Sequence, residues 1–184
     1  YEILRCLVGS EMCIRDRELT KMQYYALVSD ILEDEAVQRL QFFRHHRFTT
    51  RLQHSINVSY YNYLICRRFH WDAVSAARAG LLHDLYFYET DAYERKEMPG
   101  QKSHSAYHPE VALENAKMRF ALNPRESDMI TKHMWPMTKA MPKYKESYVI
   151  VIVDKYVAAL EFCALGFRRM KRYVWKKSAA SENS

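Results

Sequence analysis

Six side chains that can bind metal ions lie in or beside apolar, helix-forming segments of this chain. They are His54, His83, Asp84, His108, His133 and Asp154. A buried imidazole or carboxylate needs a hydrogen bond or a cation, because burying it without one costs free energy. Any one of the six is more simply explained as a hydrogen-bonded core residue. All six together are best explained by a metal site.

The ligand types indicate which ions such a site would hold. Imidazole and carboxylate groups without thiolate suit one or two divalent transition-metal ions (Fe, Mn, Co, Ni or Zn) better than Mg. Two such ions would outweigh the charge of two aspartates, and a net positive site favours a phosphate anion. Two metal ions can also supply a hydroxide that attacks phosphorus, so no serine or cysteine nucleophile is required.

The order of these residues resembles the HD superfamily of metal-dependent phosphohydrolases, over roughly residues 43–161. The resemblance is carried by the single residues His108 and His133 and by three motifs. These are Arg51-Leu-Gln-His54-Ser-Ile-Asn-Val58, Gly80-Leu-Leu-His-Asp84 and Val151-Ile-Val-Asp154-Lys155. The resemblance implies that one ion is held by four residues, namely His54, His83, Asp84 and Asp154. It also implies that His108 and His133 hold a second ion, with Asp84 bridging the two.

The activity implied by the resemblance is hydrolysis of a phosphate mono- or diester or anhydride of a nucleotide-like small molecule. Asp84 and His83 would be catalytic. Leu85-Tyr86-Phe87 follows the His-Asp pair where many HD-GYP-like proteins have a glycine and a lysine. This difference argues against a cyclic dinucleotide and leaves the substrate open.

Three cationic residues near the predicted ligands are candidates for contact with a substrate phosphate. Lys155 follows Asp154 and would either assist catalysis and bind phosphate or reach solvent. Lys132 precedes His133, and Arg51 lies one helical turn before His54. Two further histidines, His45 and His46, are either solvated loop residues or part of the mouth of a substrate site.

Two other functions are compatible with parts of the sequence. A few HD proteins with similar ligands hold a di-iron centre and oxidise C–H bonds with dioxygen. The net charge of +6 is concentrated after Ala164, where six basic residues face one acidic residue. A nucleic-acid-binding role would therefore depend on this tail alone.

The surrounding sequence predicts an all-α fold, and the resemblance implies that it is a single HD-domain helical bundle. The chain has 184 residues, 48% of them apolar, but only 4 glycines and 5 prolines, which are too few for the turns of an all-β protein. We expect residues 1–17 to be a non-native or disordered leader, 18–165 the HD domain and 166–184 a basic C-terminal helix or tail. The four cysteines imply no disulfide framework, which favours a cytoplasmic location, and no apolar run is long enough to span a membrane.

The expected helices place each candidate ligand at or near a helix end or in a buried helix. Helices are predicted over 51–69, over 73–83 with Asp72 as N-cap, from Pro109 to about 122, from Pro124 to about 133, and over 146–164 with Gly166 ending the last. The stretch Glu89–Tyr107 is predicted to be a loop, either a lid over the site or an inert insertion. His108 would then precede a helix, on irregular backbone.

Overall fold

The protein is all-α, as its sequence predicts. The computed structural model describes residues 18–45, 49–90, 93 and 102–181, with the backbone alone from residue 164 onward. The first helix covers residues 18–32. The other elements are α2 (Glu35–Arg39), the 3-10 helix η1 (Leu40–Phe42), β1 (Arg44–His45), β2 (Thr49–Thr50), α3 (Arg51–Arg68), α4 (Ala73–Leu82), α6 (His104–Lys117), α7 (Pro124–Lys132) and α8 (Lys145–Ser181).

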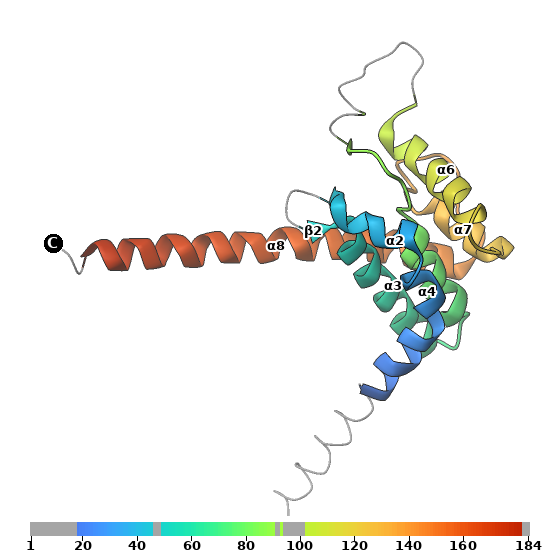
Figure 1. The fold of residues 1–184 in the computed structure, drawn as a ribbon, viewed down its shortest axis with the longest axis horizontal. Helices are drawn as coiled ribbons and strands as arrows, with labels where there is room; N and C mark the ends of the chain where they lie inside the picture. The colour runs from blue at the N-terminus through green and yellow to red at the C-terminus, as the bar shows by residue number, and fades with distance from the viewer. Residues whose placement is uncertain (1–17, 46–48, 91–92, 94–101, 182–184) are drawn as a thin grey trace, which may run out of the picture.

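The helices that carry the candidate ligands surround α4. Helix α4 packs against α3 and α7, and the beginning of α8 packs against α3 and α7 as well (Figure 1). The remainder of α8 extends away from this body as a single long helix. Among the helices of the described part of the chain, none is both long enough and apolar enough to cross a membrane.

Local hydrogen bonds fix where three of the helices begin. The side chains of Thr50, Asp72 and Asn123 accept hydrogen bonds from backbone N–H groups in the first turns of α3, α4 and α7. Such caps satisfy donors that have no partner inside the helix. The predicted cap at Asp72 and the predicted start at Pro124 are therefore confirmed.

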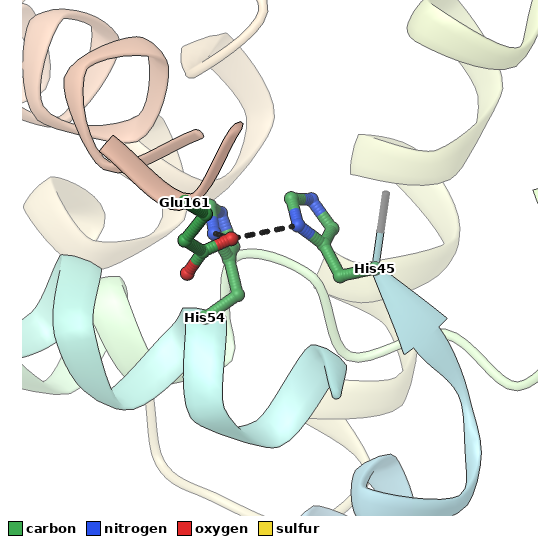
Figure 2. A group of neighbouring side chains, drawn as sticks. All are labelled: His45, His54 and Glu161. Carbon is green, nitrogen blue, oxygen red and sulfur yellow. Dashed lines mark hydrogen bonds and ion pairs between the residues drawn. The ribbon is translucent and has the colours of Figure 1, made fainter. Parts of the chain in front are cut away.

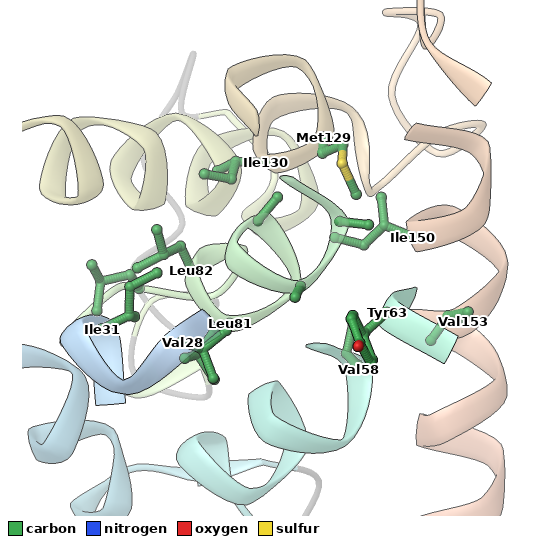
Figure 3. Packing of buried hydrophobic residues seen from close by; sticks show 14 of the residues in the cluster. Val28, Ile31, Val58, Tyr63, Leu81, Leu82, Met129, Ile130, Ile150 and Val153 are labelled. Carbon is green, nitrogen blue, oxygen red and sulfur yellow. The ribbon is translucent and has the colours of Figure 1, made fainter. Parts of the chain in front are cut away.

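The apolar core lies between the helices and holds them in place. Its buried members include Ile31, Val58, Leu82, Ile130 and Ile150, which come from five different helices (Figure 3). At Gly80 helices α3 and α4 come so close that a Cβ atom would lie 2.6 Å from the Cα of Ser59. Glycine is needed there because of this close approach, and the approach sets the position of the His83-Asp84 pair that follows.

Two predicted helix boundaries are wrong. Helix α6 begins at His104, so Pro109 lies in its second turn and His108 is helical instead of preceding the helix. A proline there removes the hydrogen bond that its N–H would make to the carbonyl of Ser105, and its ring crowds that carbonyl. Helix α8 runs through Gly166 to Ser181, because one glycine costs a helix only about 1 kcal/mol. The backbone of residues 166–181 thus continues α8 and is not a separate element.

Some predictions fall on residues whose placement is not described. The leader 1–17 lies wholly outside the described residues, and so does most of the predicted lid. The connector before α3 is partly described and contains a small feature that the sequence did not predict. Strands β1 and β2 pair there antiparallel, with His45 opposite Thr49.

Candidate metal centre

The structure brings all six predicted ligands together from five elements. His54 lies on α3, His83 and Asp84 follow α4, His108 lies on α6, His133 follows α7, and Asp154 lies on α8. Five of the six are buried, and Asp154 is partly exposed. Side chains separated by up to 100 positions in sequence therefore lie in one cluster.

The first group of ligand atoms comes from His54, His83, Asp84 and Asp154. The Nε2 atom of His54 lies 3.0 Å from Asp154 Oδ1, and the Nε2 atom of His83 lies 3.6 Å from the same oxygen. His83 Nε2 also lies 3.7 Å from Asp84 Oδ2. Ligand atoms bound to one transition-metal ion at about 2.0–2.2 Å lie roughly 3–4 Å apart, so this spacing fits an ion.

The second group uses the other oxygen of Asp84. His108 Nε2 and His133 Nε2 lie 2.9 Å from each other. Their distances to Asp84 Oδ1 are 3.4 Å and 3.7 Å respectively. Asp84 thus directs Oδ2 at one group and Oδ1 at the other, which is the arrangement expected of a carboxylate that bridges two ions.

Backbone carbonyls orient three of the histidines. The Nδ1 atom of His83 lies 2.9 Å from the carbonyl oxygen of Gly80, and Nδ1 of His133 lies 2.8 Å from that of Ile130. His108 makes the same contact, at 2.8 Å, with the carbonyl of His104. When Nδ1–H donates to a carbonyl, Nε2 carries the lone pair, as a metal ligand requires.

Two ligand atoms have no hydrogen-bond partner among the described residues. His83 Nε2 and Asp84 Oδ1 are both buried and make no hydrogen bond to a described residue. Leaving such atoms unpaired costs free energy, and a metal ion would satisfy both. The donor set therefore fits one or two divalent ions, and the geometry leaves the identity of the metal open.

Two histidines of the first group are held beside negative charge. Burial alone would lower the pKa of His54, but its hydrogen bonds to Asp154 and Glu161 raise that pKa to about 9. The pKa of His83 is also raised, because the charges of Asp84 and Asp154 outweigh the effect of burial. The raised pKa values keep both rings protonated, and the protons between these rings and the aspartates occupy the position that a metal ion would take.

The second group has the opposite character. Burial, together with the neighbouring imidazoles His108 and His83, lowers the pKa of His133 to about 3. Burial is also the main cause that lowers the pKa of His108. Burial raises the pKa of Asp84, yet the surrounding imidazoles outweigh it and keep that carboxyl ionised. The second group is thus neutral imidazole beside carboxylate, ready to bind a cation.

The structure gives Arg51 a structural position. The side chain is fully buried, and its guanidinium donates to the backbone carbonyls of Tyr86 at 2.6 Å and Tyr88 at 3.2 Å. It also lies 3.6 Å from the centroid of the Tyr86 ring. These contacts turn two of its nitrogens to the backbone, and contact of Arg51 with a substrate phosphate stays a prediction.

The two candidate lysines differ in how closely they approach the ligands. Lys155 is exposed, and its Nζ donates to the carbonyls of His133 at 3.3 Å and Val151 at 3.2 Å. Lys132 is half-buried in the last turn of α7. Lys155 is therefore placed near the ligands, and a role of either lysine toward a substrate stays a prediction.

Two side chains at the site are absent from the predicted set. Glu161 on α8 and His45 on β1 form a third group with His54 that could hold a metal ion (Figure 2). Glu161 follows Asp154 by seven residues, which is two helical turns, so the two share a face of α8. That spacing could have identified Glu161 from sequence, whereas nothing in the local sequence distinguishes His45 from its neighbour His46.

Comparison with known proteins adds no relative. The chain matches no protein-family model and no curated protein. Inferences about its chemistry therefore depend on the geometry of the site and on the resemblance in its motifs.

Proposed function

We propose that this protein is a metal-dependent phosphohydrolase that acts on a phosphate ester or anhydride of a nucleotide-like small molecule. The observation that carries the proposal is the position of Asp84, whose two oxygens face two separate groups of imidazole nitrogens. A bridging carboxylate between two histidine-containing groups is the pattern of a two-metal hydrolytic centre.

Charge supports a phosphate as the substrate. Two divalent ions would bring four positive charges, while Asp84 and Asp154 supply two negative ones. When bound, such ions polarise a phosphoryl oxygen and lower the pKa of a water molecule enough to make it a nucleophile at neutral pH. Lys155 lies at the edge of this centre, where its ammonium group could bind the remaining phosphate oxygens.

The residues of the chain have two tasks in this mechanism. The histidines, held through Nδ1, fix their Nε2 atoms in place, so the ligand set does not have to rearrange for each turnover. His83 and Asp84 are buried, whereas Asp154 is partly exposed, which favours entry of a substrate from the side of Asp154.

The test combines metal analysis with a substrate screen. Purified without chelator, the full chain is expected to contain about two transition-metal ions and to hydrolyse p-nitrophenyl phosphate esters or a nucleotide. Asp84→Ala should lose both metal and turnover. The matched control is Asp30→Ala, because Asp30 is exposed and pairs only with Arg78 among its described ion-pair partners.

Two results would contradict the proposal. Turnover that survives in Asp84→Ala would show that the centre is not catalytic. Consumption of dioxygen with an organic substrate, in the absence of phosphate release, would assign the same ligands to an oxygenase.

A further inference from the structure

The carboxylate of Glu161 lies behind the first group of ligands, where it contacts two imidazole rings at once. Its Oε2 atom lies 3.3 Å from Nδ1 of His54 and 3.5 Å from Nδ1 of His45. Oε2 also accepts a hydrogen bond of 2.9 Å from the Thr49 hydroxyl, and Oε1 accepts one of 3.4 Å from Asn57 Nδ2. Three donors and the ion pair with His45 thus hold this carboxylate in one place, and the side chain is only 10% exposed.

This contact determines which ring nitrogens can bind metal. An ionised carboxylate only accepts hydrogen bonds, so Nδ1–H of His54 donates to Glu161 and Nε2 is the nitrogen left to bind a metal ion. Nδ1 of His45 faces the same oxygen in an ion pair. Nε2 of His54 then faces Asp154 Oδ1 at 3.0 Å. Glu161 thus does for His54 what backbone carbonyls do for His83, His108 and His133.

The short sheet brings His45 to the same ion position. Because His45 pairs with Thr49, strand β1 folds back over the first turn of α3. The ring of His45 stacks on that of His54, with centroids 3.7 Å apart, and its side chain is 12% exposed. Its Nε2 atom lies 3.9 Å from Asp84 Oδ2, the oxygen that belongs to the first group.

We propose that His45 and Glu161 belong to the metal centre. His45 would be an additional nitrogen ligand of the first ion. Glu161 is the positioning residue that holds His45 and His54 through Nδ1. The inference rests on the metal centre of the proposed function and adds to it. The first ion would have five protein ligands (His45, His54, His83, Asp84 and Asp154) and the second only three.

This asymmetry predicts different roles for the two ions. A six-coordinate first ion would keep one position for water or a phosphate oxygen, whereas the second would keep several. The first ion is therefore expected to be the tightly held one, and the second the exchangeable one that takes up most of the substrate oxygens. A titration should accordingly show two classes of site.

The experiment measures metal binding, so it does not require a known substrate. The full chain is stripped with chelator, reloaded with Co²⁺ and titrated against a competing chelator while the visible spectrum is recorded. Variants are His45→Gln, Glu161→Gln and Glu161→Asp. Controls are His70→Asn and Glu110→Gln, since the side chain of Glu110 is about half exposed in an ion pair with Lys102, and asparagine tolerates the positive φ of His70.

The expected result is specific to the tighter class of site. His45→Gln and Glu161→Gln should each weaken Co²⁺ binding there about 10- to 100-fold, as loss of such partners does in known metal sites. Glu161→Asp should recover part of that loss. His45→Gln should also change the ligand-field bands of the bound Co²⁺, which a purely structural histidine would leave unaltered. Urea unfolding of the chelated variants shows whether each one still folds.

Three outcomes would overturn the inference. One is an unchanged affinity and spectrum in His45→Gln. Another is a Glu161→Gln variant that binds Co²⁺ as tightly as Glu110→Gln does. The third is a wild-type stoichiometry of three ions that falls to two in both variants, because His45, His54 and Glu161 would then hold an ion of their own.

These outcomes are separable from the proposed function. If the wild-type chain binds Co²⁺ as expected but hydrolyses no phosphate compound, the function fails and the ligand assignment stands. If hydrolysis depends on Asp84 but His45→Gln binds metal normally, the assignment fails and the function stands.

Discussion

Replacing Arg51 with lysine would show whether this buried cation supports the metal centre or binds substrate. Its guanidinium donates to the carbonyls of Tyr86 and Tyr88, which follow the His83-Asp84 pair almost directly. Arg51 therefore fixes the chain where it leaves the centre. Lysine keeps the charge but lacks the planar fork that reaches two carbonyls at once.

The expected loss of stability follows from these contacts. One buried carbonyl left without a partner costs about 1–3 kcal/mol, and a weaker contact with the Tyr86 ring costs about 1 kcal/mol more. Arg51→Lys should therefore lower the free energy of unfolding by about 2–4 kcal/mol. Arg51→Met leaves both carbonyls unpaired and should lower it by about 3–7 kcal/mol, a large share of the roughly 5–15 kcal/mol typical of a domain.

Urea unfolding of the chelated full chain measures this loss. The control is Arg67→Lys on the same helix, since Arg67 is exposed and donates to the hydroxyls of Thr20 and Tyr63. That change should lie within about 0.5 kcal/mol of wild type. The structural role would be refuted if Arg51→Lys unfolded at the same urea concentration as Arg67→Lys. A raised KM for a phosphate substrate in that same variant would support the binding role predicted from the sequence.

Three further predictions concern a helix contact, a proton and a lysine. Gly80→Ala should lower the free energy of unfolding by about 1–3 kcal/mol, because the new Cβ would lie 2.6 Å from Ser59 Cα; a urea midpoint equal to wild type would contradict this close contact. The pKa of His54 is raised from its ordinary value of 6.5 to about 9. The contribution of protonated His54 to the stability of the chelated protein is therefore fully present below pH 6.5 and lost as the pH rises through 9. Metal affinity should rise over the same pH window, because the ion displaces the proton of His54. Calorimetric titration at several pH values measures this, and a metal affinity that does not change with pH would contradict it. Lys155→Met should raise KM for a phosphate substrate and leave metal content unchanged, and metal loss in this variant would place Lys155 among the residues that hold the centre instead.

The fold could be predicted from sequence where local chemistry determines structure. Asp72 and Asn123 have side chains that cap a helix, and each is followed by residues that continue one. The scarcity of glycine and proline excluded an all-β chain, and the structure is all-α. These features depend on a few neighbouring residues, so a sequence contains most of the information they need.

The boundaries that were mispredicted depend on contacts between distant residues. Pro109 is typical of a first helical turn, but α6 begins five residues earlier at His104. His104 stacks on His108 with ring centroids 4.6 Å apart and packs beside Tyr86 and Tyr88, which come from the segment after α4. Burial of these rings favours one more helical turn than the proline alone would indicate, and the sequence around Pro109 does not reveal that packing.

The candidate site divides in the same way. The six predicted ligands could be found because each is a polar residue in or next to an apolar helical segment, where burial makes it costly unless it is paired. Glu161 carried the same signal, since it lies between Leu160 and Phe162 and two helical turns after Asp154, but it was not included; His45 lies in a basic connector and carried none. Their importance comes from a shared partner, since only the closed bundle brings both to His54. A residue that positions a metal-binding histidine is recognised by its contact with the ring nitrogen that does not bind the metal. The sequence next to that residue does not reveal this contact. Such residues should therefore be sought by asking, for each buried histidine, what holds the nitrogen that faces away from the metal.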